Sequence, residues 1–165
     1  MTEANPVERG YTLTRILDAP RDLVFQAWTD PEQLVWFYNP EAATPEGPIE
    51  VDLRVGGTWR LKMVINEETE YFTGGIYREI EPFDRLSFIW GATDGWPKID
   101  PDSPDDGALV TLQFNDIADS TEMIFTLTLP ENMSDDEVRE WLETPHMRQG
   151  WSDTIDRIVG QLAGR

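Results

Sequence analysis

The sequence predicts an α+β fold: a curved antiparallel sheet of seven strands around a long C-terminal helix, with two short helices between the first two strands. Apolar residues recur with a period of two across residues 49–129, and with helical spacing after residue 145. Turn residues separate the period-two segments, so neighbouring strands are expected to pair as hairpins. Because a strongly twisted sheet of this width has to curl around a single helix, we expect a cavity between the two.

The N-terminal part of the chain is expected to hold one strand and both short helices. Residues 1–9 are a polar lead, and a β-prone run follows over residues 11–16. Ala19-Pro20 ends this strand, and apolar residues at helical spacing then predict a short helix over residues 21–28. Asp and Pro at positions 30 and 31 are typical of a helix start, so a second short helix is expected over residues 30–37.

Six further strands are expected in the middle of the chain. They cover residues 49–53, 58–65, 70–80, 85–91, 109–115 and 121–129. The pattern is clearest in the second of these, where Trp59, Leu61 and Met63 share one face and Thr58, Arg60 and Lys62 share the other. Gly56-Gly57 and Gly74-Gly75 are expected at turns, bulges or close contacts. A loop rich in Asp and Pro, residues 94–107, is expected near the mouth of the cavity.

Two helices are expected after the last strand. Residues 134–137 match a capping box, which predicts the start of a short helix. Thr144-Pro145 is typical of a second helix start, and the apolar stripe behind it ends near Gly164. That stripe consists of Met147, Trp151, Ile155, Ile158, Val159 and Leu162. The long helix is expected to contact the sheet from Gly150-Trp151 to Leu162.

Length and charge restrict the function classes. Residues 1–165 are expected to form a single domain, since this length suits one domain and no linker interrupts the pattern. A net charge of −19 repels phosphate backbones and anionic lipids, so nucleic acid and membranes are not expected as partners. There is no signal-peptide pattern, no long apolar run and no cysteine, so a cytoplasmic location is expected. The protein is expected to be a monomer or a homodimer.

Motifs for catalysis, metals or cofactors are weak throughout. His146 is the single histidine and has no recognisable nucleophile to activate. The acidic run from Asp100 fails the calcium-loop pattern, because Pro104 and Asp105 stand where an oxygen ligand and a glycine are needed. The paired glycines lack the spacing of a nucleotide-binding loop. No catalytic residue, metal or cofactor is therefore expected.

The candidate site is the expected wall of the cavity. It is a set of aromatic, Met and Ile residues on the inner faces of the strands and the long helix. These are Trp59, Met63, Tyr71, Tyr77, Phe88, Trp90, Phe114, Met123, Phe125, Met147, Trp151 and Ile155. Such a wall suits flat apolar molecules, and Tyr71, Tyr77 and Ser87 are expected to add polar anchors. Arg60 and Arg78 are expected to point outward.

Five stretches resemble the superfamily of START and Bet v allergen type domains (SRPBCC). They are R-I-L-D-A-P-R-D-L-V-F-Q-A-W-T-D-P (residues 15–31), W-F (36–37), D-L-R-V-G-G-T-W-R (52–60), R-L-S-F-I-W (85–90) and Q-G-W with its trailing I-D-R-I (149–158). Together they are similar to the branch homologous to the C-terminal domain of the heat-shock protein 90 ATPase activator. The resemblance implies a helix-grip fold with an internal cavity, and does not choose among the functions found on that fold.

Three functions are consistent with these observations. The first is a binding or carrier domain for a small apolar or aromatic molecule, without catalysis. The second is an enzyme of the cyclase or aromatase kind, in which the cavity positions a reactive chain. The third is a co-chaperone-like interaction domain that meets a basic partner through its acidic surface. We favour them in this order.

Overall fold

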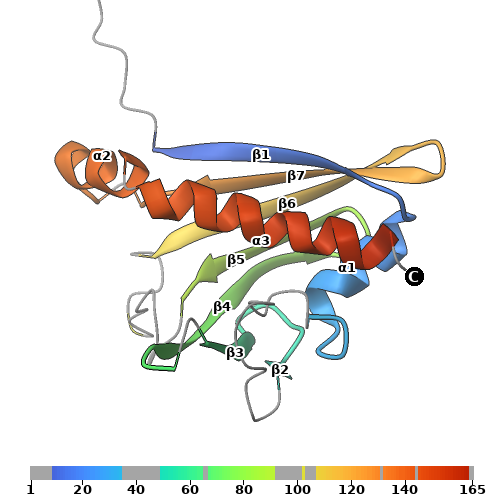
Figure 1. The fold of residues 1–165 in the computed structure, drawn as a ribbon, viewed down its shortest axis with the longest axis horizontal. Helices are drawn as coiled ribbons and strands as arrows, with labels where there is room; N and C mark the ends of the chain where they lie inside the picture. The colour runs from blue at the N-terminus through green and yellow to red at the C-terminus, as the bar shows by residue number, and fades with distance from the viewer. Residues whose placement is uncertain are drawn as a thin grey trace, which may run out of the picture.

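The computed structural model describes residues 9–34, 49–64, 67–91, 102, 107–130, 132–143 and 145–163. Within them, seven strands form one antiparallel sheet in the order β1-β7-β6-β5-β4-β3-β2 (Figure 1). The strands are β1 (Gly10–Leu17), β2 (Glu50–Val51), β3 (Thr58–Val64), β4 (Glu70–Glu81), β5 (Arg85–Trp90), β6 (Ala108–Ile117) and β7 (Ser120–Thr128). The helices are α1 (Arg21–Thr29), α2 (Asp135–Glu143) and α3 (Pro145–Ala163). The predicted fold class is confirmed.

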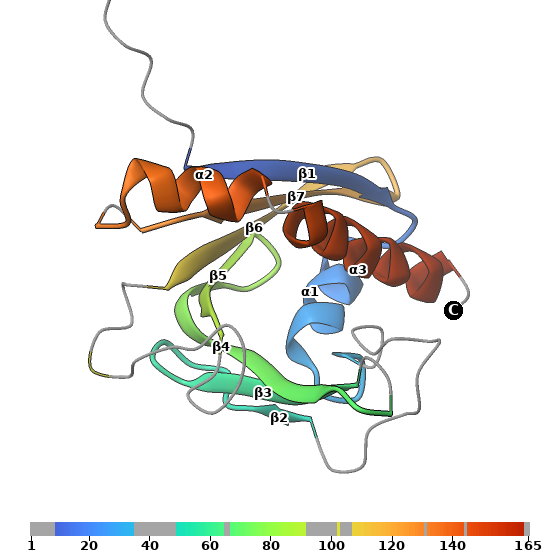
Figure 2. The same ribbon diagram turned by 60° about the vertical axis from the view of Figure 1, so that its left-hand side comes forward.

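The sheet is curved, and both α1 and α3 lie on its concave side. Figure 2 shows the sheet curling from β1 and β7 on one side of these helices to β3 and β2 on the other. α3 contacts β1, whereas α1 contacts β6 and β7. The register of β4 against β5 shifts between Tyr77 and Glu79, and a bulge of this kind increases the local twist of a strand. The sheet therefore wraps the two helices as the sequence predicts.

Polar side chains tie the helices and the N-terminal segment to the sheet. The Arg15 guanidinium reaches from β1 to α3, donating through Nε to Asp156 Oδ1 at 2.8 Å and through Nη2 to Ser152 Oγ at 2.7 Å. Arg9 donates to the carbonyl oxygens of Pro130 and Met133, just before α2. Residue 9, expected at the end of a loose lead, is thus held in place, and residues 1–8 lie outside the described part of the chain.

The second short helix, expected over residues 30–37, is described only in its first part. Residues 31–34 form a helical turn, and residues 35–37 lie outside the described ranges. Asp30 caps this turn as expected, because its Oδ1 accepts from the Glu32 backbone N–H at 2.9 Å. Backbone N–H groups of Gln33 and Leu34 both donate to the Asp30 carbonyl oxygen. The N-cap pattern thus predicted where this turn begins.

The first strand of the central region is shorter than expected, at Glu50–Val51 instead of residues 49–53. The chain turns away at Asp52, whose N–H still bonds the Thr58 carbonyl at 2.8 Å across the turn. Gly56 adopts a φ of 84°, a conformation that residues with a side chain rarely adopt, so this glycine is a turn residue as predicted.

No helix among the described residues has the length and apolar character needed to cross a membrane.

Candidate ligand-binding face

The concave face is built by alternation along the strands. The inward-facing residues have odd numbers on β3 and, up to Tyr77, on β4, and even numbers on β5 and β6, so that Trp59, Gly75 and Trp90 lie in one cross-strand row. In the next row, Tyr77 pairs with Phe88, which in turn pairs with Val110. Residues far apart in sequence thus form one continuous aromatic surface.

Gly75 makes room for the aromatic side chains at the centre of this face. A Cβ atom there would lie 2.5 Å from Trp59 Nε1 and 2.7 Å from Phe88 Cδ2, which is too close for either ring to stay in place. The rings of Trp59 and Phe88 meet edge to face, with centroids 5.2 Å apart and planes at 83°. Gly75 is therefore a close-contact glycine, one of the roles predicted for it.

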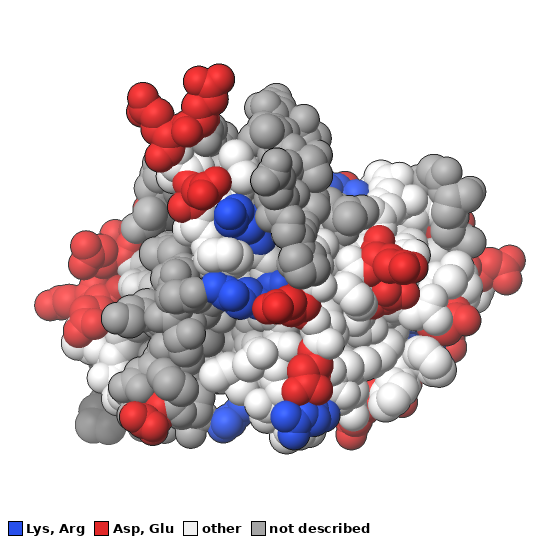
Figure 3. Space-filling view, turned by 90° about the horizontal axis from the view of Figure 1, so that it is seen from below, with Lys and Arg blue, Asp and Glu red and all other residues white. Residues whose placement is uncertain are grey.

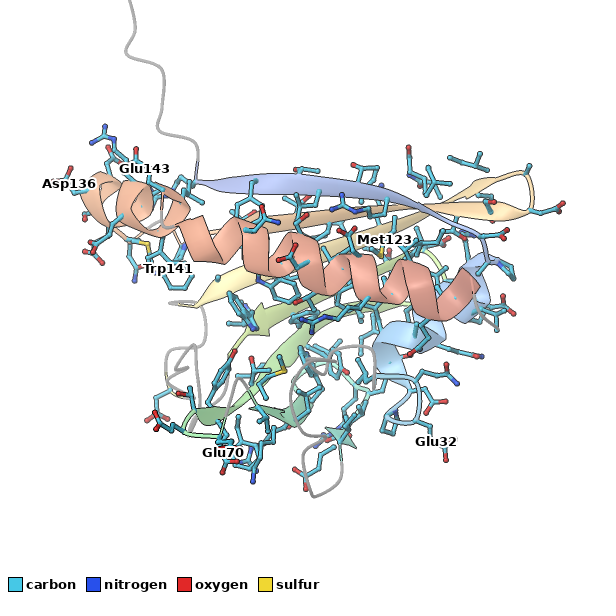
Figure 4. The ribbon with its side chains drawn as sticks, viewed as in Figure 1. Glu32, Glu70, Met123, Asp136, Trp141 and Glu143 are labelled. Atoms are coloured by element: carbon cyan, nitrogen blue, oxygen red, sulfur yellow. The ribbon has the colours of Figure 1, made fainter. Side chains whose placement is uncertain are left out.

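Helix α3 closes part of the face through Trp151. Its ring centroid lies 4.9 Å from that of Trp90 on β5 and 4.8 Å from that of Phe125 on β7. Trp90 donates through Nε1 to Thr73 Oγ1 at 3.0 Å, and this bond fixes the indole on the concave side of β4. Trp141 of α2, labelled in Figure 4, meets Trp90 edge to face at 6.5 Å. Three indoles from three elements thus converge at this end of the face.

Helix α1 covers the other end. Trp28 donates through Nε1 to the thioether sulfur of Met123 at 3.2 Å, and Met123 projects from β7 toward the side on which the helices lie (Figure 4). Phe25 packs edge to face on Phe114 at 6.1 Å. The sequence reasoning missed Trp28 and Phe25 as part of this surface. Trp28 lies four residues after the buried Val24, a helical spacing that could have revealed it.

Two tyrosines of β4 lie on the same face in different environments. Tyr77 is fully buried, and its hydroxyl has no hydrogen-bond partner among the residues that the structure describes. Burial and the nearby Asp52 carboxylate both raise the Tyr77 pKa above its ordinary value. Tyr71 is half-buried; burial raises its pKa, while the Arg157 guanidinium on α3 acts in the opposite direction. Arg157 therefore lies close enough to Tyr71 to act on it across the space between α3 and β4.

The structure brings most of the predicted wall together. Ten residues of the set are buried on the concave side: Trp59, Met63, Tyr77, Phe88, Trp90, Phe114, Met123, Phe125, Trp151 and Ile155. Tyr71 is half-buried at the edge of this face. The side chains of His146 and Met147 lie outside the described part of the structure, as does the acidic loop except for Asp102 and Gly107.

Ser87 is the predicted anchor that the structure contradicts. It pairs with Thr111 and Glu79 between the inward-facing Leu86 and Phe88, so its side chain points to the convex side of the sheet. There it lines a hollow of about 340 Å³ together with Arg78, Ile89, Leu109, Thr128 and Pro130. Arg78 and Arg60 point outward as predicted; the Arg60 guanidinium lies 3.7 Å from the centre of the Phe72 ring.

The outer surface near β2 and β3 carries charges of both signs. Figure 3 shows basic groups beside acidic ones on this side of the molecule. Lys62 lies 3.7 Å from Glu70, and Arg54 donates to Asp52 at 2.8 Å. Exposed pairs of this kind stabilise a fold only slightly.

Among the described residues, no group of three or more His, Cys, Asp or Glu side chains is placed to hold a metal ion.

Comparisons with solved structures show the same fold in other proteins. A Mycobacterium smegmatis protein is 21% identical and matches with a TM-score of 0.73, covering 94% of this chain and 92% of its own. A Nitrosomonas europaea protein is 22% identical with a TM-score of 0.72, covering 96% of this chain and 97% of its own. An HSP90 activator from Plasmodium falciparum is 20% identical with a TM-score of 0.57, covering 88% of this chain and 89% of its own.

The family comparison agrees with the fold. A search of curated proteins finds no match to the sequence. The family model described as Activator of Hsp90 ATPase homolog 1-like protein matches residues 18–163. This match begins directly after β1, spans α1 to α3 and includes nearly all of the concave face described above. The chain therefore belongs to the family of Activator of Hsp90 ATPase homolog 1-like proteins, in agreement with the resemblance seen in its sequence.

Proposed function

We propose that this domain binds a small, flat, apolar or aromatic molecule on its concave face, between the sheet and α3. The observation that carries the proposal is the mixed chemistry of that face. Large aromatic rings meet edge to face, and the hydroxyl groups of Tyr71, Thr73 and Tyr77 are set among them. A ligand site typically combines an apolar lining with a few polar groups that fix orientation.

The arrangement of α3 supports the same proposal. α3 is held at β1 by the bonds of Arg15 to Ser152 and Asp156, which lie on the β1 side of the curved sheet. On the other side, Arg157 of α3 is near enough to Tyr71 of β4 for its charge to act against the rise in the Tyr71 pKa that burial causes. An apolar guest would enter between β4 and α3 and contact Trp59, Phe88 and Trp151.

A methyl NMR titration tests the proposal and locates the site. The probe is 2-ethylnaphthalene, added to protein labelled at its Met, Ile and Leu methyl groups. The expected result is saturable shifts at Met63, Met123 and Ile155, which are buried on the concave side. Ile89 and Leu109 line the hollow on the convex side and should not respond. No binding, or shifts confined to Ile89 and Leu109, would refute the proposal.

A further inference from the structure

Tyr77 is buried on the concave face, and its hydroxyl has no partner among the described residues. Its ring packs edge to face on Phe88 at 6.5 Å, and its residue exposure is 0%. The hydroxyl makes no hydrogen bond within the described part of the chain, although a phenol can both donate and accept. Buried side-chain polar atoms nearly always have a partner, and each exception needs a reason. A ligand that supplies the missing partner is such a reason.

The electrostatic surroundings define which partner fits. Burial and the Asp52 carboxylate raise the Tyr77 pKa, so the hydroxyl keeps its proton at neutral pH and acts as a donor. A charged partner is disfavoured mainly by burial, because Tyr77 is 0% exposed and an ionised group there would lose its hydration. Asp52 accepts a bond from Arg54 Nε at 2.8 Å, in an exposed pair on the β2–β3 turn. The group that meets Tyr77 should therefore be an uncharged acceptor.

The neighbouring rings define the shape of the rest of the ligand. Phe88 lies edge to face with both Trp59 and Tyr77, at 83° and 87°. Gly75, which pairs with Trp90, leaves the space above the strand to these rings. Flat aromatic guests pack well against rings in edge-to-face and offset arrangements.

From these observations we propose that Tyr77 anchors the ligand by donating a hydrogen bond to an uncharged oxygen acceptor. The ligand class is accordingly a flat aromatic ketone, ester, amide or quinone, and not a free carboxylic acid. This inference rests on the proposed function, because it assumes that the concave face binds an apolar molecule.

Three matched probes test the inference: 2-acetylnaphthalene, 2-ethylnaphthalene and 2-naphthoate. Dissociation constants are measured by calorimetry for the wild type, Tyr77→Phe and Tyr11→Phe. Tyr11→Phe is the matched control, since it makes the same change at a partly buried tyrosine of β1 that is not among the residues proposed to line the site. Loss of one neutral hydrogen bond should weaken 2-acetylnaphthalene binding by up to about tenfold in Tyr77→Phe. Binding of 2-ethylnaphthalene should stay the same, and 2-naphthoate should be the weakest ligand of the wild type.

The outcomes separate this inference from the proposed function. If 2-ethylnaphthalene binds but Tyr77→Phe leaves 2-acetylnaphthalene binding unchanged, the anchor is wrong and the proposed function stands. Equal losses in both variants, or a preference for 2-naphthoate, would also overturn the anchor. If no probe binds the wild type, both proposals fail. Tyr77→Phe should fold normally, because it removes an oxygen atom that has no partner in the described part of the structure, and thermal unfolding checks this.

Discussion

Gly75 lies where the concave face is most crowded, and replacing it by alanine should destabilise the protein. The added Cβ would lie 2.5 Å from Trp59 Nε1, 2.7 Å from Phe88 Cδ2 and 2.9 Å from the Ile89 carbonyl oxygen. The two side chains can shift only at the expense of their edge-to-face contact. The Ile89 oxygen belongs to the backbone of β5 and cannot move aside without disturbing the sheet.

The size of the effect follows from these contacts. Overpacking a core costs about 1–3 kcal/mol, and three contacts below 3.0 Å place Gly75→Ala at the upper end of that range. Alanine recovers about 0.5–1 kcal/mol, because glycine loses more backbone freedom when it folds into a strand. The net loss is about 2 kcal/mol, which lowers Tm by about 4–8 °C in a domain of this size.

Gly160→Ala is the matched control in the same chain. Apart from the backbone of α3 itself, no atom of the described residues lies within 4 Å of a Cβ added to Gly160. The substitution should therefore raise the free energy of unfolding by up to about 1 kcal/mol. Urea and thermal unfolding of both variants measure the two effects. A Gly75→Ala protein within about 0.5 kcal/mol of the wild type would refute the packing described for Trp59 and Phe88.

Three further predictions concern other parts of the structure. Thr121→Val should cost about 1–3 kcal/mol, since Thr121 Oγ1 is buried and donates to the Ala19 carbonyl at 2.7 Å; a smaller loss in a urea titration would contradict this. Without ligand, Tyr77→Phe should be at least as stable as the wild type. The Tyr77 pKa is higher in the folded state than in the unfolded state, whose tyrosine ionises near about pH 10. The free energy of unfolding of the wild type should therefore be independent of Tyr77 ionisation below about pH 10 and should fall above it. Tyr77→Phe lacks this ionisation, so its stability relative to the wild type should increase at alkaline pH. Parallel stability curves would exclude that role of Tyr77. Finally, a net charge of −19 opposes folding, so Tm should rise between about 0.1 M and 1 M NaCl, and a fall would show that ion pairs dominate instead.

The sheet could be predicted from the sequence because its signal is local. Period-two alternation places Trp59, Leu61 and Met63 on one face whatever the rest of the chain does. By the same alternation, Ser87 and its neighbour Phe88 lie on opposite faces of the sheet. The expected role of Ser87 as a polar anchor beside Phe88 therefore conflicted with the strand pattern itself. Tyr71 and Tyr77 are an even number of residues apart and precede the bulge, which is why both reach the concave side.

The contacts between elements could not be predicted in this way. The bond from Trp28 to Met123, and the packing of Trp151 between Trp90 and Phe125, depend on how the helices cross the curved sheet. The same is true of the lone hydroxyl of Tyr77, because a missing partner is a property of the packed structure.

The central claim is that the concave face, between the sheet and α3, receives an apolar guest. Intermolecular NOEs between bound 2-ethylnaphthalene and the methyl groups of the protein test it most directly. The account predicts NOEs to Met123 on β7 and to Ile155 on α3, both buried on the concave side. NOEs to Ile89 and Leu109 on the convex side, or no NOE at saturating probe, would contradict it.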